Sequence, residues 1–186
     1  MAISSISPIP ASSWHGQLQL EFDRQHHKTL VSHSYAQAPL KVQRPFYPEG
    51  DAICHSVMLH TAGGIVGGDR LSIQVKAHPN AQTLLTTAAA TKVYRTNGRE
   101  AQQQIQIAGA AGSCVEWLPQ ETIVFDGAVY RQDLRVDLAP DAVWLGWDIT
   151  RLGRSARGEK FASGDWRSKT EVWQGDRLVW VDPQRI

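Results

Sequence analysis

The sequence has 186 residues, and its 19 Lys and Arg against 18 Asp and Glu give a formal net charge of +1 at pH 7. Hydrophobic residues make up 42% and charged residues 20%, which is typical of one folded globular domain and excludes a disordered chain. The balanced charge excludes a general nucleic-acid-binding protein, because phosphate contacts require a clear excess of Lys and Arg.

The amino-terminal segment does not resemble a secretory signal. It has no basic residue before Arg24, and prolines at positions 8 and 10 interrupt its apolar residues. The two cysteines, Cys54 and Cys114, are far apart in the sequence and do not form a disulfide framework. We therefore expect a cytoplasmic protein.

Short runs of alternating apolar and polar residues follow one another along the chain, separated by Gly, Pro, Asn and Asp. Strands are predicted near residues 18–22, 52–60, 71–77 and 134–138, and a hairpin is predicted for residues 169–181 around Gly175. This pattern predicts a mainly all-β fold, either a sandwich or a β-helix-like stack of short strands. One or two short helices are expected, one within residues 81–95, where three alanines occur together, and one near Arg151.

The domain organisation is simple. Residues 1–15 are rich in Ser and Pro and are expected to form a loose lead-in. Residues 16–186 show no repeat of fixed period and no linker, so they are predicted to form a single β domain.

The glycine-rich stretch at residues 61–69 (TAGGIVGGD) suggests a phosphate site, since successive amide groups can form an anion-binding concavity. A phosphate-binding loop of the Walker type ends in Gly-Lys-Ser/Thr, however, whereas Asp69 and Arg70 follow the glycines here. We expect these glycines to supply positive φ angles in turns between strands, and we expect no GTP binding by this chain.

The histidines do not show metal-site spacing. Cys54 and His60 share one face of a predicted strand but lie roughly 20 Å apart, too far to share one ion. Adjacent His26 and His27 are expected to point to opposite faces of a strand. No tightly bound metal or cofactor is predicted.

Several acidic residues lie beside large apolar groups or turn glycines. Residues 116–127 (EWLPQETIVFDG) place Glu116, Glu121 and Asp126 among apolar side chains, and Asp69 closes the glycine-rich stretch. A carboxylate in such a place needs a partner, water or a cation. The alternatives are acids at wet turn edges and a polar path for a divalent cation in transit, formed by Asp69, Glu116, Glu121 and Asp126.

Seven tryptophans are many for this length, and most are expected to fill the core. Trp166, Trp173 and Trp180 lie in the charged carboxy-terminal third, where Arg and Trp together are typical of protein interfaces. Arg154 and Trp166 are predicted to contact a partner.

Several longer stretches, in order, resemble the urease accessory protein UreD, called UreH in some bacteria. The matching stretches are residues 44–50 (RPFYPEG), 59–69 (LHTAGGIVGGD), 88–95 (AAATKVYR), 116–127, 146–148 (GWD) and 152–154 (LGR). The proline that the family usually carries after the histidine is replaced here by Thr61-Ala62. Family members also continue beyond the position of Ile186, so the domain over residues 16–186 is expected to lack the family's last strands and to be poorly soluble alone.

The resemblance implies a non-enzymatic scaffold for urease maturation. Such a protein joins the accessory proteins UreF and UreG on the urease apoprotein and assists GTP-dependent nickel delivery, with nickel in transit and GTP held only by a partner. Two other classes stay open on the residues alone. One is a small metal-dependent β-fold hydrolase using Glu116 and Glu121, and the other is a β-rich module that binds carbohydrate or peptide through surface tryptophans.

Overall fold

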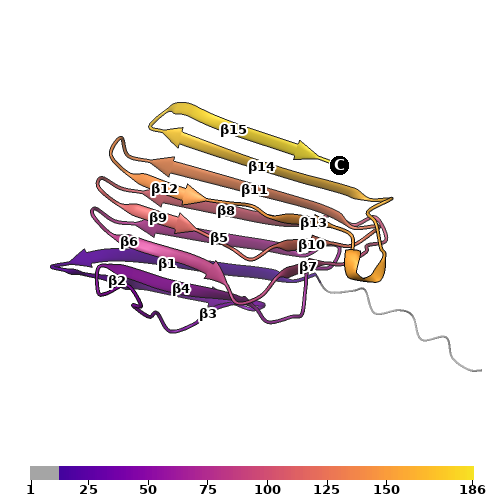
Figure 1. Ribbon diagram of the computed structural model, residues 1–186, viewed down its shortest axis with the longest axis horizontal. Helices are drawn as coiled ribbons and strands as arrows, with labels where there is room; N and C mark the ends of the chain where they lie inside the picture. The colour runs from indigo at the N-terminus through magenta and orange to yellow at the C-terminus, as the bar shows by residue number, and fades with distance from the viewer. Residues whose placement is uncertain (1–12) are drawn as a thin grey trace, which may run out of the picture.

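The chain winds into a coil of short parallel strands, seen in a computed structural model that describes residues 13–186 (Figure 1). Each turn of the coil has three sides, and each side contributes one strand to one of three sheets. The strands are β1 (His15–Gln25), β2 (Lys28–Gln37), β3 (Leu40–Val42), β4 (Ile53–His60), β5 (Arg70–Ala77), β6 (Gln82–Thr87), β7 (Thr91–Val93), β8 (Ala101–Gly109), β9 (Cys114–Trp117), β10 (Thr122–Val124), β11 (Val129–Leu138), β12 (Val143–Gly146), β13 (Thr150–Leu152), β14 (Asp165–Gln174) and β15 (Arg177–Arg185).

The sheet order follows from this winding. The seven-stranded sheet has the order β15-β14-β11-β8-β5-β1-β2, the five-stranded sheet β12-β9-β6-β4-β3, and the three-stranded sheet β13-β10-β7. Strands β5, β6 and β7 form one turn, β8, β9 and β10 the next, and β11, β12 and β13 the third. The stacked arrangement predicted from the alternating pattern is therefore confirmed, and the sandwich is not formed.

The core consists of side chains stacked in register along the coil. Leu18, Ile73, Ile105 and Leu134 are partners on neighbouring strands of the seven-stranded sheet, and all four are buried. A second row places Val75, Ile107, Val136 and Val172 side by side. Because side chains alternate between the two faces of a strand, each predicted apolar face points into the coil as one continuous layer.

The glycine-rich stretch forms the turn between β4 and β5, as predicted. Gly64 and Gly68 have φ angles of +155° and +97°, which side-chain-bearing residues rarely adopt. Gly64 also lies against the Lys92 carbonyl and the Tyr94 ring, so a Cβ atom there would clash. The turn therefore needs these glycines for conformation and close packing.

Two local predictions are wrong. Residues 81–95 contain no helix; they form β6 and β7, joined by a loop over residues 88–90. Parallel pairing of β6 with both β4 and β9, together with its threonines, outweighs the helix preference of the alanines. His26 and His27 form the turn of the β1–β2 hairpin rather than part of a strand, and His26 has a φ of +53°.

The remaining elements agree better with expectation. A 3₁₀-helix, η1 (Ser155–Arg157), lies just after the position near Arg151 where a short helix was expected. Strands β14 and β15 form the predicted antiparallel hairpin. The expected lead-in falls mostly on residues 1–12, outside the described residues, and β1 already begins at His15. Within residues 13–186, no helix has the length and apolar character needed to cross a membrane.

Candidate functional site

A row of polar side chains crosses the inside of the coil at positions where the strand pattern would place apolar residues. Gln103 on β8, Gln132 on β11 and Ser168 on β14 are direct partners in the parallel register. Because side chains alternate along a strand, they point to the same inward side as core residues such as Ile105 and Leu134. The seven-stranded sheet therefore carries one polar track along its inner face.

Hydrogen bonds join this row to the loop between β12 and β13. The Gln132 Nε2 group donates to Oδ2 of Asp148 at 2.6 Å, and the Ser168 hydroxyl donates to the same oxygen at 3.3 Å. The buried Tyr130 hydroxyl lies 3.2 Å from Oε1 of Gln132 and 3.5 Å from Oε1 of Gln103. These five side chains are here called the polar row.

Burial dominates the electrostatics of the polar row. Desolvation of the carboxylate raises the pKa of Asp148, although the residue as a whole is exposed. The hydrogen bonds from Ser168 and Gln132 oppose the rise, and the negative charge of Asp182 adds to it. Burial also raises the pKa of Tyr130, so its hydroxyl stays protonated as a donor. The polar row thus contains one carboxylate that is costly to ionise and that a cation would stabilise.

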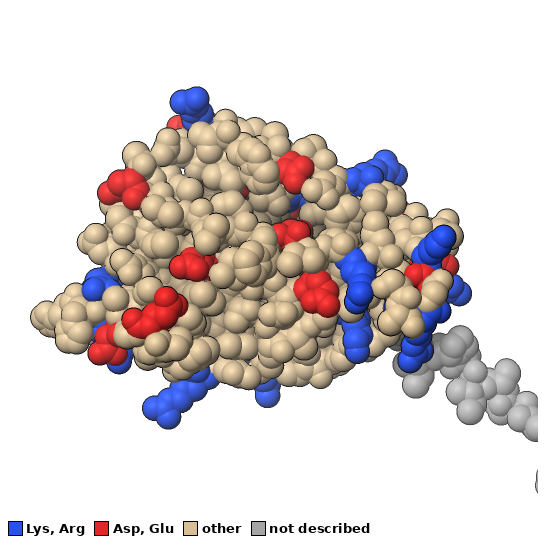
Figure 2. All heavy atoms as spheres, in the orientation of Figure 1, with Lys and Arg blue, Asp and Glu red and all other residues tan. Residues whose placement is uncertain are grey.

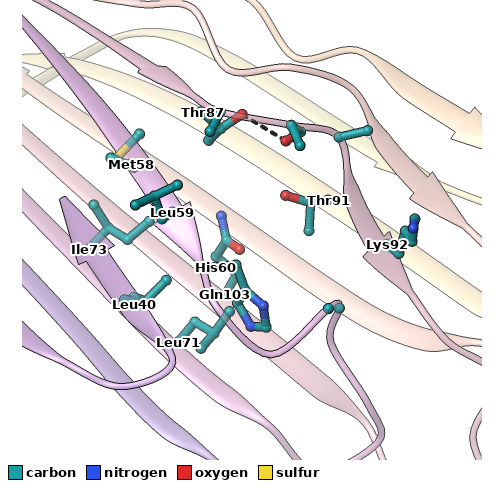
Figure 3. A pocket seen from close by; sticks show the side chains of 15 residues that line it. Leu40, Met58, Leu59, His60, Leu71, Ile73, Thr87, Thr91, Lys92 and Gln103 are labelled. Atoms are coloured by element: carbon teal, nitrogen blue, oxygen red, sulfur yellow. Dashed lines mark hydrogen bonds between the residues drawn. The ribbon is translucent and has the colours of Figure 1, made fainter. Parts of the chain in front are cut away.

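A cavity opens at each end of the polar row. One, of about 250 Å³, is lined by Gln103 and His60 together with apolar side chains including Met58 and Ile73 (Figure 3). The other, of about 280 Å³, is lined by Asp148, Ser168 and Asp182. The polar row therefore runs from one cavity to the other.

His60 gives the first cavity an imidazole with unused hydrogen-bonding capacity. Neither ring nitrogen has a hydrogen-bond partner among the described residues, and burial lowers the pKa of the ring despite the nearby charge of Asp69. A neutral imidazole offers one donor and one acceptor. Both His60, from β4 of the five-stranded sheet, and Gln103, from β8 of the seven-stranded sheet, line this cavity, and they are drawn close together in Figure 3.

The ligand types along the polar row are amide, hydroxyl and carboxylate. Such oxygen groups bind hard or borderline divalent cations, and imidazole suits nickel as well. In the part of the chain that the structure describes, no three His, Cys, Asp or Glu side chains gather to hold a metal ion. The polar row thus offers oxygen groups of the kinds that contact such cations, without a cluster of three of those four residue types in the described part of the chain.

Two of the four predicted acids have structural contacts. Asp69 is buried and accepts hydrogen bonds from the backbone N–H groups of Trp14 and Val66, both at 2.9 Å. Asp126 accepts backbone bonds from Ala162 at 2.9 Å and Ser163 at 2.8 Å, and these bonds lower its pKa. Both carboxylates are already engaged in holding turns and loops.

The other two predicted acids are not engaged. Glu116 points outward from β9, and Glu121 precedes β10; among residues 13–186, neither side chain has a hydrogen bond or ion pair. The structure does not gather the four acids into one cluster. Within residues 13–186, Glu116 and Glu121 have no third His, Cys, Asp or Glu placed to share an ion with them, and a transit role for these two acids stays a prediction.

The predicted partner-binding residues occupy different environments. Arg154 is half exposed, forms an ion pair with Glu159 and lies over the Phe125 ring at 4.4 Å. Trp166 is only 4% exposed and packs in the core on β14. The exposed surface expected for Trp166 is thus absent, because its strand position points inward, whereas binding through Arg154 stays a prediction.

Comparison with known proteins identifies the family. The sequence model of the UreD urease accessory protein matches residues 15–186. The chain belongs to the UreD family. It is 62% identical over 171 residues to the urease accessory protein UreD of Nostoc sp., covering 92% of this chain and 61% of that protein. It is 60% identical over 175 residues to the urease accessory protein UreD of Trichormus variabilis, covering 94% of this chain and 63% of that protein. It is 44% identical over 184 residues to the urease accessory protein UreD of Synechocystis sp., covering 99% of this chain and 68% of that protein.

The chain thus spans about three fifths of the length of the Nostoc sp. and Trichormus variabilis relatives. The stretches that resemble the family contribute to both the fold and the site. Residues 59–69 include His60 and the glycine turn, and residues 146–148 end at Asp148. Asp148 was part of a matching stretch but was not among the predicted site residues.

Sequence reasoning missed the polar row, although a signal was present. On β11 the inward-pointing residues Tyr130, Leu134 and Val136 are large and mostly apolar, and Gln132 is the polar exception among them. On β14, Ser168 is the next inward-pointing residue after Trp166 and is also polar. A polar residue in the inward phase of a strand must find a partner inside the coil. That signal marks each position but does not show that the positions are neighbours.

Proposed function

We propose that this UreD chain acts in urease maturation as a non-enzymatic accessory protein in the cytoplasm. The observation that carries the proposal is the family match over residues 15–186, supported by relatives named as urease accessory proteins. UreF, UreG and the urease apoprotein are the proposed partners. In this proposal the chain positions these proteins and catalyses no reaction itself.

The cargo is nickel, and GTP is bound by the partner UreG. The turn that contains Gly67 and Gly68 continues with Asp69 and Arg70, without the Lys and Ser/Thr that hold nucleotide phosphates and magnesium. A carboxylate at that point disfavours phosphate. GTP binding is therefore proposed for the partner alone.

The proposed nickel route is the polar row with its two cavities. Asp148, Gln132 and Ser168 supply oxygen ligands, and the absence of a three-ligand cluster in the described residues favours release over retention. The earlier candidates Asp69 and Asp126 fit a route less well, because their oxygens already accept backbone N–H bonds. Asp148, by contrast, accepts both of its side-chain bonds on Oδ2, so its Oδ1 has no hydrogen bond among the described residues and can contact an ion.

Complementation tests the proposal directly. A urease gene cluster whose own UreD gene is deleted receives this chain, and urease activity and nickel content per urease active site are measured. We expect the chain to restore both quantities above the deletion background. No restoration, with the chain present at normal abundance, would overturn the proposed role.

Variants of the polar row test the route separately. Asp148→Asn should lower nickel content while co-purification with urease proteins is unchanged. The matched control is Asp133→Asn, because Asp133 is an outward carboxylate on β11 that pairs with Arg131 at 2.7 Å. Equal nickel content for both variants would place the route elsewhere.

A further inference from the structure

The outward face of the five-stranded sheet carries little charge. Across β4, β6, β9 and β12 the single Asp, Glu, Lys or Arg is Glu116, and the edge strand β3 adds the exposed Lys41. The outward face of the seven-stranded sheet differs, because β11 and β14 present alternating ion pairs such as Arg131–Asp133 and Lys169–Glu171. The two sides of the coil are therefore exposed to different surroundings.

Large apolar side chains project from the same side as Glu116. On β12, Val143 is 57% and Leu145 is 54% exposed, and Trp147 just beyond it is 49% exposed. Figure 2 shows that the surface over the region of β6, β9 and β12 is mostly uncharged but broken by several separate acidic groups, and that most Lys and Arg side chains lie toward the margins. A contiguous apolar area with so little charge is typical of a protein interface.

Glu116 lies between two leucines on this face. The parallel register places Leu84 of β6 on one side of it and Leu145 of β12 on the other. Its side chain is partly buried and has no hydrogen bond or ion pair with any residue from 13 to 186. Covering this carboxylate with an apolar surface alone would remove water from an unpaired charge, which is strongly unfavourable.

We propose that the outward side chains of β4, β6, β9 and β12, here called the β9 face, dock a protein partner. The contact surface of that partner is apolar and places one Lys or Arg against Glu116. The apolar side chains supply buried area, and the ion pair sets the register of the two surfaces. This inference rests on the proposed function, since it gives the surface through which a urease accessory protein or urease subunit binds.

Charge complementarity argues against three other occupants. A second copy meeting the β9 face with its own β9 face would bring Glu116 and no Lys or Arg from these four strands; Lys41, the one Lys of this sheet, lies on the edge strand β3, separated from β9 by two strands. Residues 1–12 contain no Lys or Arg. An anionic membrane requires basic residues, which the four strands lack.

Binding measurements with the 186-residue chain test the proposal. The chain is immobilised, and purified UreF, UreG and urease apoprotein are each used as probes. Glu116→Lys should weaken the binding of one probe about 30-fold or more, because it places a positive charge against the Lys or Arg of the partner. Leu145→Asp should weaken the same probe, and the exposed position of Leu145 allows the variant to fold. Gln104→Lys, an exposed change on the outward face of β8, is the matched control and should leave binding unchanged.

Reversal of charge provides the decisive result. A Lys→Glu or Arg→Glu change on the bound probe should restore affinity for Glu116→Lys while weakening affinity for the original chain. Binding that is insensitive to both Glu116→Lys and Leu145→Asp would overturn the β9 face while leaving the proposed function intact. If the original chain binds none of the three probes, the proposed function itself fails. Self-association abolished by Leu145→Asp would assign the face to a second copy and would also overturn the inference.

Discussion

Gln132 and Asp148 meet across a 2.6 Å hydrogen bond that ties the seven-stranded sheet to the loop between β12 and β13. The bond holds Oδ2 of Asp148 against the sheet beside the second cavity; the residue as a whole is exposed, and desolvation of its carboxylate raises its pKa. The amide of Gln132 is itself held from the other side by the Tyr130 hydroxyl. One side chain on a strand therefore orients both the carboxylate and the phenol of the polar row.

The raised pKa of Asp148 predicts a specific pH dependence of stability. Between the ordinary and the raised pKa, the folded chain binds more protons at this site than the unfolded chain, so the free energy of unfolding falls as pH rises. Asp148→Asn should remove this contribution. Denaturant unfolding from about pH 4 to pH 7 should show the variant gaining stability relative to the original chain as pH increases. Parallel curves would contradict the assignment.

Asp69 and Glu121 should respond differently to truncation, although both were predicted as path residues. Asp69→Ala leaves the N–H groups of Trp14 and Val66 without their acceptor and should lower the free energy of unfolding by about 1–3 kcal/mol. Glu121→Ala removes no hydrogen bond or ion pair known among residues 13–186 and should change stability little. Equal losses in thermal unfolding would refute the structural role of Asp69.

Trp166 should behave as a core residue rather than as a contact residue. Trp166→Ala removes a large buried side chain and should cost about 3–5 kcal/mol of stability, reducing soluble yield. Trp180→Ala is the control, because Trp180 on β15 is 49% exposed. If Trp166→Ala unfolded at the same denaturant concentration as the original chain while losing partner binding, the earlier interface prediction would hold.

Nickel binding by the isolated chain should be weak. No cluster of three His, Cys, Asp or Glu occurs in the described residues, so calorimetric titration should give a dissociation constant weaker than micromolar. Asp148→Asn should weaken it further, whereas Asp133→Asn should not. A tight stoichiometric site in the original chain would mean that the polar row retains the ion rather than passing it on.

Several features of this protein follow from local sequence alone. The alternation of Leu71, Ile73, Val75 and Ala77 predicted β5 and its buried face, and the glycines at 64 and 68 predicted a turn with positive φ angles. The matching stretches gave the family, later confirmed by comparison. These inferences succeed because strand periodicity and glycine conformation depend on neighbours in the chain.

Other features depend on the register between distant strands. Residues 81–95 contain alanines that favour helix and threonines that favour strand, and pairing of β6 with β4 and β9 decides for the strand. Gln103, Gln132 and Ser168 are polar residues at inward strand positions, and neighbours in this set are about one turn of the coil apart along the chain. Parallel pairing brings them into one line, and the loop that follows β12 adds Asp148. The sequence alone therefore determined which residues alternate and where the chain turns. The tertiary structure decided which polar groups meet, because hydrogen bonding across the coil depends on strand register and not on separation along the chain.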